Sequence, residues 1–184
     1  MSEKFIKIGI THPEPLQKES QKIADLLISG NIDFMHIRKP AMDEQDLKTL
    51  VNKLPRHLHH KLKIHNHFKL IYDFNLGGIH ISSSYKEIPL IDKNQAINKD
   101  ISISKSMHII EELTDSSLFD YVFLSPIFDS ISKEGYFSPF NLNEISRFIT
   151  NKNVVALGGV TPEKFPLLKE KGFYGAAMLG YLWN

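Results

Sequence analysis

Short apolar segments recur along the chain, and most of them are followed by a polar stretch with helical spacing. Runs rich in Ile, Val, Phe and Leu predict eight strands, at residues 5–11, 32–38, 61–66, 77–82, 100–104, 121–128, 153–159 and 174–180. Stretches with one apolar face predict helices between them, at residues 15–30, 42–54, 68–74, 106–113, 141–150 and 161–172. The pattern is weakest at 83–99, which is predicted to be a reduced helix or an irregular crossover.

The regular alternation of strands and helices predicts a parallel sheet. Eight such units favour an α/β fold of the closed (β/α)₈ TIM-barrel type over an open, doubly wound sheet. No repeat or linker interrupts the pattern, so residues 1–184 are predicted to form a single domain. The sequence ends four residues beyond the last predicted strand, so the eighth helix is expected to be missing or replaced by a partner subunit.

Composition removes several classes of function. The net charge is +1, which gives no electrostatic reason to expect binding to nucleic acid or to an anionic membrane. Cysteine is absent, so disulfides, thiolate nucleophiles and Cys-ligated zinc are excluded. The first residues carry charge and lack an apolar signal segment, and no apolar run approaches the roughly 20 residues of a membrane span. We therefore expect a cytoplasmic protein without nucleic-acid or membrane partners.

Two loops at predicted strand ends suit a phosphate. Ser130, Ser132 and Lys133 follow strand 121–128 and offer two hydroxyl donors and a cation. Gly158 and Gly159 end strand 153–159 and allow backbone amides to approach a ligand closely. Either loop alone fits a surface turn with structural duties equally well. Because active sites of such barrels lie at the carboxyl ends of the strands, the two together predict a small-molecule phosphate substrate.

Histidines also gather at the predicted strand ends. His65 and His67 share one strand face, and His36 and His80 lie on the neighbouring strands. Such a group is a conceivable metal cluster, but inward-facing polar side chains that satisfy one another fit equally well. We assign no metal ligand among them. The run HLHH at 57–60 precedes a strand at the opposite end and is predicted to be solvated surface.

Five segments in order resemble the motifs of the thiamine phosphate synthase and TenI family: MHIRKP (35–40), IHNHF (64–68), GGIHIS (77–82), DYVFLSPIFDSISK (120–133) and VVALGGVTPEKF (154–165). The resemblance implies a barrel that binds a thiazole phosphate at the loops after strands 6, 7 and 8. The synthase joins this thiazole to a pyrimidine diphosphate with Mg²⁺. TenI-type relatives include a thiazole tautomerase, which moves a proton and needs no metal, and they suggest a homodimer.

The resemblance also implies roles for residues at matching positions. Substrate-binding residues would be an arginine on the pyrimidine side, an asparagine, a phosphate-binding loop and two amide donors: Arg38, Asn66, Ser130, Ser132, Lys133, Gly158 and Gly159.

Other positions depart from the family pattern. The two Mg²⁺-binding aspartates of the synthase fall at His67 and Tyr85, which are poor ligands for a hard cation. Its strand-2 lysine falls at Pro40, with Lys39 one step early and on the other strand face. The tautomerase histidine after strand 5 falls at Lys105, which we predict to be the catalytic acid–base group. Mg²⁺ is expected only if the protein is a synthase.

The pattern therefore predicts an enzyme of thiamine biosynthesis, most similar to TenI and of the thiazole tautomerase type. Three alternatives stay open: a Mg²⁺-dependent thiamine phosphate synthase, a non-catalytic thiazole-phosphate binder, and a histidine-rich metal hydrolase.

Overall fold

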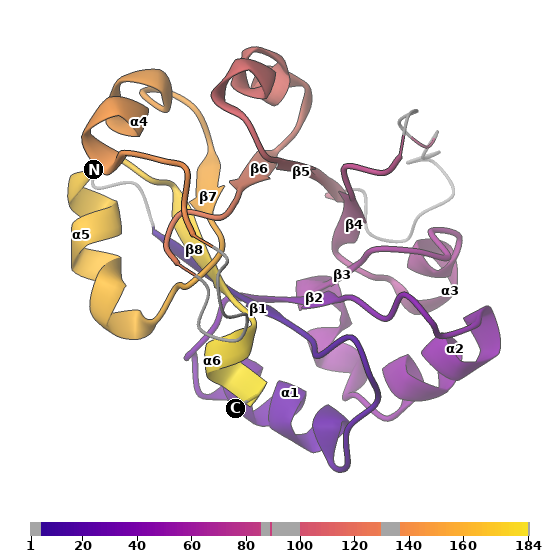
Figure 1. Cartoon of the computed structure of the whole chain (residues 1–184). Helices are drawn as coiled ribbons and strands as arrows, with labels where there is room; N and C mark the ends of the chain where they lie inside the picture. Colours follow the sequence, from indigo (N-terminus) through magenta and orange to yellow (C-terminus); the bar gives the residue numbers. More distant parts are fainter. Residues whose placement is uncertain (1–4, 86–88, 90–99, 130–136, 184) are drawn as a thin grey trace.

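Eight parallel strands close into a barrel in which each strand pairs with the next and β8 pairs with β1 (Figure 1). The computed structural model of the protein describes residues 5–85, 89, 100–129 and 137–183. The strands are β1 (Ile6–Ile10), β2 (Phe34–Ile37), β3 (Leu62–Ile64), β4 (Gly78–Ile81), β5 (Ser102–Met107), β6 (Tyr121–Leu124), β7 (Val154–Ala156) and β8 (Gly175–Met178). The predicted (β/α)₈ barrel is confirmed.

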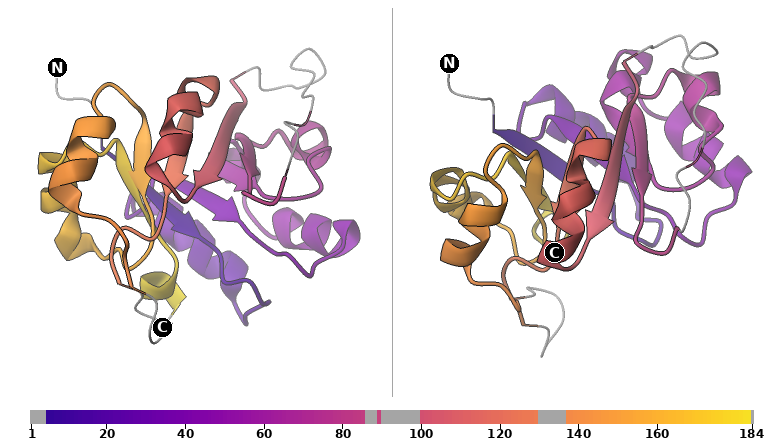
Figure 2. Two further views of the ribbon diagram at one scale, coloured as in Figure 1. Left: turned by 45° about the horizontal axis from the view of Figure 1, so that its top comes forward. Right: turned by 90° about the horizontal axis from the view of Figure 1, so that it is seen from above.

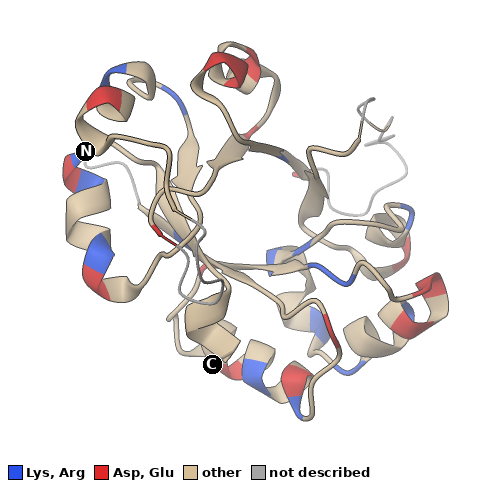
Figure 3. Ribbon diagram, viewed as in Figure 1, with Lys and Arg blue, Asp and Glu red and all other residues tan. Residues whose placement is uncertain are grey.

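The helices lie outside the ring, with α1 to α3 on one side and α4 and α5 on the other (Figures 1 and 2). They are α1 (Glu19–Ile28), α2 (Glu44–Asn52), α3 (Leu70–Phe74), α4 (Leu142–Phe148), α5 (Phe165–Glu170) and α6 (Gly180–Trp183). The described part of the chain adds the 3₁₀ helices η1 (Arg56–Lys61), η2 (Ile110–Leu118) and η3 (Pro162–Lys164) to this layer. Within the described ranges, no helix is long and apolar enough to cross a membrane. Charges of both signs lie mainly on these outer elements (Figure 3).

Two apolar cores follow from the alternation of side chains along the strands. The larger one fills the space between the barrel and the helices. The smaller one fills part of the barrel interior and comes from β1, β6, β7 and β8: Ile6, Ile8, Ile10, Tyr121, Phe123, Val155 and Ala177. The facing half of the interior is polar, because β2 to β5 bury His36, Lys63, His80 and Ser104.

The largest correction to the predicted elements concerns strand 5. It was predicted at 100–104 with a helix from 106, but β5 extends to Met107 and the helical segment begins only at Ile110. The reason is pairing on both sides. β4 pairs with Ser102 to Lys105, and β6 pairs with Ser104 to Met107. Most of the uncertain connection 83–99 lies outside the described residues.

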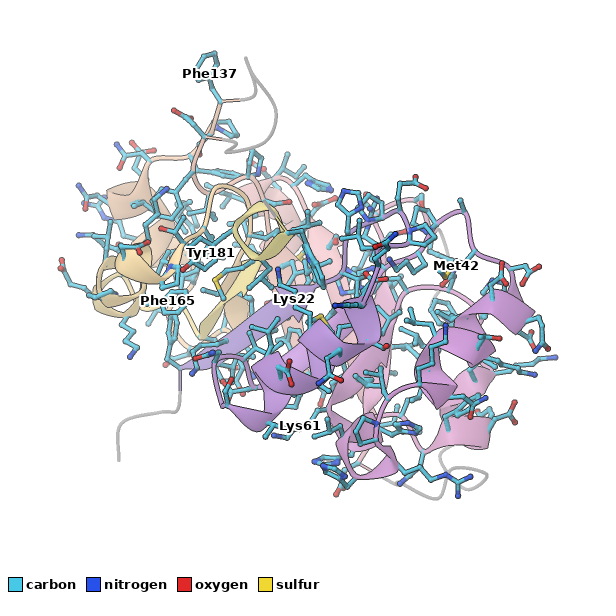
Figure 4. All side chains as sticks on the ribbon, turned by 90° about the horizontal axis from the view of Figure 1, so that it is seen from below. Lys22, Met42, Lys61, Phe137, Phe165 and Tyr181 are labelled. Atoms are coloured by element: carbon cyan, nitrogen blue, oxygen red, sulfur yellow. The ribbon has the colours of Figure 1, made fainter. Side chains whose placement is uncertain are left out.

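A single helical turn, α6, follows β8 directly, where no helix was expected. Its Leu182 is buried, and the indole N–H of Trp183 donates to the Ile10 carbonyl at 2.7 Å. Lys22 of α1 lies over the Trp183 ring at 5.0 Å, and Figure 4 shows α1 beside the turn that carries Tyr181. A helical turn therefore stands after β8, where the eighth helix was expected to be missing or replaced, and the homodimer stays a prediction.

A buried ion pair joins the loop after β2 to the first residue of α1. Lys39 Nζ lies 2.6 Å from Glu19 Oε1, and the two residues are 0% and 4% exposed. The ammonium group also donates to the carbonyls of His12 and Glu14 at 2.8 Å, so all three of its protons are used. Lys39 therefore points away from the barrel interior, and the pair holds the loop after β1 against the loop after β2.

We expect Lys39→Met to lower the free energy of unfolding by about 3–5 kcal/mol, because it leaves the Glu19 carboxylate buried without its partner. Urea denaturation at pH 7 measures the change. The double variant Lys39→Met/Glu19→Leu should recover most of the loss, since neither charge is then buried. Lys48→Met, which removes the exposed Lys48–Glu44 pair at 2.9 Å, is the matched control. A loss in the double variant as large as in the single variant would contradict the prediction.

Candidate functional site

A cavity of about 520 Å³ opens at the carboxyl ends of the strands. Its polar lining includes Arg38, His65, His80, Ser82, Ser106, Ser125 and the two glycines after β7. A larger cavity of about 790 Å³ lies at the opposite end and is lined by residues where strands begin, such as Ile6, Phe34 and Ser102. Because barrels of this type carry their active sites at the carboxyl ends, the first cavity is the candidate site.

The glycine loop after β7 contributes two free amides to this cavity. Gly158 and Gly159 have φ angles of +93° and +60°, a conformation that favours glycine. Within the described residues, neither of their N–H groups donates a hydrogen bond. Both glycines also serve packing, because a Cβ atom at Gly158 would lie 2.7 Å from Pro126 Cα and one at Gly159 would meet the Asp129 carbonyl. The loop can therefore present amides to an anion, and its glycines are needed for shape as well.

The loop after β6 is described only as far as Asp129. Ser130, Ser132 and Lys133 lie outside the described residues, so their roles stay predictions. Lys164, which the sequence did not single out, places a cation near the glycine loop. Its Nζ donates to the Gly159 carbonyl at 2.6 Å and lies 4.1 Å from the Phe128 ring centre. No pattern in the sequence distinguishes this lysine from others on exposed helices.

The predicted substrate-binding residues Arg38 and Asn66 occupy different surroundings. Arg38 lines the cavity, and its backbone is held by Thr11, whose Oγ1 accepts from Arg38 N at 2.8 Å and donates to its carbonyl at 3.1 Å. Asn66 does not line the cavity. Its side-chain amide donates to the Lys39 carbonyl at 3.1 Å, and its buried Oδ1 has no partner within the described chain. The structure therefore brings Arg38 together with Gly158 and Gly159, without Asn66.

Lys105 faces outward, away from the cavity. Ser104 and Ser106 occupy the inward side of β5, and Lys105 Nζ lies 5.6 Å from the centre of the Phe119 ring in the outer layer. This position gives no support to a catalytic Lys105. The residue that directly follows β5 is His108, whose Nδ1 lies 3.1 Å from the carbonyl oxygen of the cavity residue Ser125. With strand 5 predicted to end at residue 104, this histidine was expected on a helix one turn beyond Lys105 and directed elsewhere, whereas it directly follows the strand.

The residues at the synthase's metal positions do not fit Mg²⁺. His67 has a φ of +50° and its Nε2 lies 3.0 Å from the Met42 carbonyl, while Tyr85 packs against Phe68 with ring centres 5.5 Å apart. Among the described residues that line the cavity there is no carboxylate, and Arg38 carries the only formal charge. Mg²⁺ prefers carboxylate, phosphate and water oxygens, which this part of the site does not offer from the protein.

Three imidazoles instead meet at the floor of the cavity. His36 Nδ1 lies 3.0 Å from His65 Nε2, and the rings of His65 and His80 stack with centres 4.3 Å apart. His36 and His80 are 0% and 1% exposed.

The prediction that the HLHH run at 57–60 is solvated is wrong for His59. This residue is 4% exposed, and its ring nitrogens lie 3.0 and 3.1 Å from the Phe74 and Leu54 carbonyl oxygens.

Burial keeps these three imidazoles neutral. The loss of water around the rings is the main reason that the pKa values of His36 and His65 lie well below the usual value of a histidine. Burial, together with the charge of Arg38, lowers the pKa of His80 to about 3. All three rings therefore present unprotonated nitrogen atoms at neutral pH.

These features define a (β/α)₈ barrel protein with a cavity at the carboxyl ends of its strands. The family model described as thiamine monophosphate synthase matches residues 8–182. A solved relative, thiamine phosphate pyrophosphorylase from Bacteroides thetaiotaomicron, superposes with a TM-score of 0.79 and is 30% identical, covering 98% of this chain and 85% of that one. The chain belongs to the thiamine monophosphate synthase (TMP-TENI) family.

Curated relatives are more distant. Thiamine-phosphate synthase of Latilactobacillus sakei is 28% identical over 130 residues, a match that spans 68% of this chain but only 58% of that protein. Thiamine-phosphate synthase of Halalkalibacterium halodurans is 24% identical over 156 residues, which are 81% of this chain and 72% of that one. At this distance the family is shown, and the reaction has to be argued from the site.

Acid should destabilise the protein through the buried histidines. Below a pH of about 6.5 an unfolded histidine binds a proton, whereas folded His80 stays neutral down to a pH of about 3. The unfolded state then binds more protons, so the free energy of unfolding falls as the pH falls, by up to about 1.4 kcal/mol per pH unit for each such histidine. His36, His65 and Arg38 surround His80 and add to this trend.

Urea denaturation between pH 7 and pH 4, in buffer containing EDTA, measures this slope. His80→Asn should reduce the slope by roughly the share of one histidine, and His57→Asn, at an exposed position, is the matched control. Equal slopes in the wild type and His80→Asn would contradict the prediction.

Proposed function

We propose that this protein binds a thiazole phosphate in the cavity at the carboxyl ends of the strands and acts as a TenI-type thiazole tautomerase. One observation carries the choice of reaction. The positions that hold Mg²⁺ in the synthase carry His67 and Tyr85, each packed against its own neighbour. The reaction that needs no metal is therefore the one this site supports best.

The phosphate half of the proposal rests on the loops after β6 and β7. The free amides of Gly158 and Gly159 can donate to phosphate oxygens, and Lys164 adds a cation beside them. By resemblance to the family, Ser130, Ser132 and Lys133 complete the set. Arg38 lies across the cavity and supplies the charge for a second acidic group, such as the carboxylate of a carboxylated thiazole.

The proton carrier in this proposal is His108. When its Nδ1–H donates to the Ser125 carbonyl, Nε2 keeps a lone pair that can accept a proton. A tautomerase removes a proton from one position of its substrate and returns one at another, so a single base that changes protonation state suffices. Ser125 lines the cavity, and the exposed His108, which contacts Ser125, is the neighbour of this lining residue.

The synthase reaction is the second candidate, because the curated relatives at 28% and 24% identity are named thiamine-phosphate synthase. In that case the phosphates of the substrates and water would have to supply the oxygens around Mg²⁺. A non-catalytic thiazole-phosphate binder is a third outcome, in which binding is present and turnover is absent.

His108→Ala should lower the tautomerase rate by about 10²- to 10⁴-fold, because it removes the general acid–base group, while binding of the thiazole phosphate is kept. Interconversion of the carboxylated thiazole phosphate tautomers, followed by NMR, measures the rate. Lys105→Ala is the matched control, since that lysine lies in the outer layer, and it should keep the wild-type rate. A loss of turnover in Lys105→Ala alone would overturn the assignment of His108.

The synthase alternative is tested with hydroxymethylpyrimidine diphosphate and thiazole phosphate, with and without Mg²⁺. We expect no thiamine phosphate above background, measured after oxidation to its fluorescent product, together with saturable binding of the thiazole phosphate. Lys133→Ala provides the reference for weakened phosphate binding. Mg²⁺-dependent product formation would overturn the tautomerase proposal in favour of the synthase.

A further inference from the structure

The three imidazoles at the cavity floor have the arrangement of a ligand set. They come from three neighbouring strand positions: His36 on β2, His65 directly after β3, and His80 on β4. One ring nitrogen from each lies within 4.8 Å of the others. His67, the fourth histidine at these strand ends, is turned away to the Met42 carbonyl.

Hydrogen bonds on the outer side of the cluster orient the rings. Ser104 Oγ donates to the Ile79 carbonyl at 3.3 Å, so it must accept the Nδ1–H of His80, 2.9 Å away. Nε2 of His80 then keeps its lone pair, which accepts from Ser106 Oγ at 2.8 Å, so a metal ion bound there would displace this hydroxyl. His36 Nε2 lies 2.7 Å from the Tyr121 hydroxyl, and donation of its N–H there leaves Nδ1 free on the side of His65. Partners of this kind fix the tautomer of histidines that bind metals.

We propose that His36, His65 and His80 form a binding site for a late first-row divalent metal ion, such as Zn²⁺, with a fourth coordination position open to the cavity. This inference is independent of the proposed tautomerase or synthase reaction. His65 and His80 line the cavity while His36 lies beneath them, so an ion held by the three nitrogens would face the bound small molecule. Catalytic zinc sites commonly combine three protein ligands with one open position.

The geometry and chemistry select the class of ion. Zn–N bonds of about 2.0–2.1 Å in a tetrahedron place ligand nitrogens roughly 3.3 Å apart, close to the 3.0 Å between His36 and His65. The wider separations, up to 4.8 Å, close by rotation of the side chains. Imidazole nitrogen suits Zn²⁺, Co²⁺, Ni²⁺ and Cu²⁺, whereas Mg²⁺ requires oxygen ligands.

Metal binding at this site has to compete with a nearby positive charge and with a hydrogen bond between the histidines. Arg38 lines the same cavity and repels a cation, so an anionic fourth ligand, such as a phosphate or carboxylate oxygen, would strengthen binding. The competing explanation is a metal-free network in which the N–H of His65 Nε2 donates to His36 Nδ1. The two explanations differ in whether the protein takes up one ion per chain.

The test is metal titration of the chelator-treated full chain. Isothermal titration with Zn²⁺ should give one site per chain, and Co²⁺ should produce the visible absorption of a four-coordinate site. His65→Ala should weaken Zn²⁺ binding by at least about 100-fold, since even partners outside the ligand set account for 10- to 100-fold. Tyr121→Phe, which removes only the hydroxyl behind His36, should weaken it by about 10-fold.

Controls separate this site from adventitious binding. His57→Asn/His60→Asn removes two exposed histidines and should keep full Zn²⁺ affinity, and Mg²⁺ should give no heat in any variant. Zn²⁺ should also raise the melting temperature of the wild type and not that of His65→Ala, which shows in the same scan whether the variant is folded. Uptake that survives in His65→Ala, or that is lost only in the double surface variant, would overturn the proposal, as would no uptake by the wild type.

Discussion

Every second residue of a barrel strand faces the interior, and this alternation decides which side chains of this protein can reach a ligand. On β2 it turns His36 inward and brings Arg38 to the cavity, and it sends Lys39 outward to a buried ion pair with Glu19. On β5 it turns Ser104 and Ser106 inward, and it places Lys105 against the outer layer. Neighbouring residues of one strand therefore have different roles: one can reach a ligand in the cavity, and the next one packs in the outer layer.

The barrel interior is divided between an apolar half and a polar half. β1 and β6 to β8 fill their half mainly with aliphatic and aromatic side chains, as barrels of this type usually do. β2 to β5 instead bury imidazoles, a serine and Lys63, whose ammonium donates to the Gly77 carbonyl and whose pKa is lowered to about 8 by burial. Each of these histidine, serine and lysine side chains has partners that offset part of its desolvation. The interior of this half therefore supplies nitrogen ligands and proton acceptors where a typical barrel supplies only packing.

Membership of the thiamine monophosphate synthase family defines the fold and leaves the reaction to the site. The loop after β7 lines the cavity with two glycines whose N–H groups donate no hydrogen bond among the described residues, which suits the phosphate that the family is expected to bind. By resemblance to the family, His67 and Tyr85 stand where the synthase is expected to carry its metal-binding aspartates. Three histidines, His36, His65 and His80, meet elsewhere in the same polar half of the barrel.

The sequence by itself determined the eight strands, their alternation with helices and the glycine loop, because periodicity and residue type are local properties. Only the tertiary structure decided the end of strand 5, since pairing with β4 and β6 carries β5 to Met107 and makes His108 the next residue. It also decided that His36, His65 and His80 meet while His67 and Asn66 turn elsewhere. Distances between strands depend on closure of the barrel, which no local pattern contains.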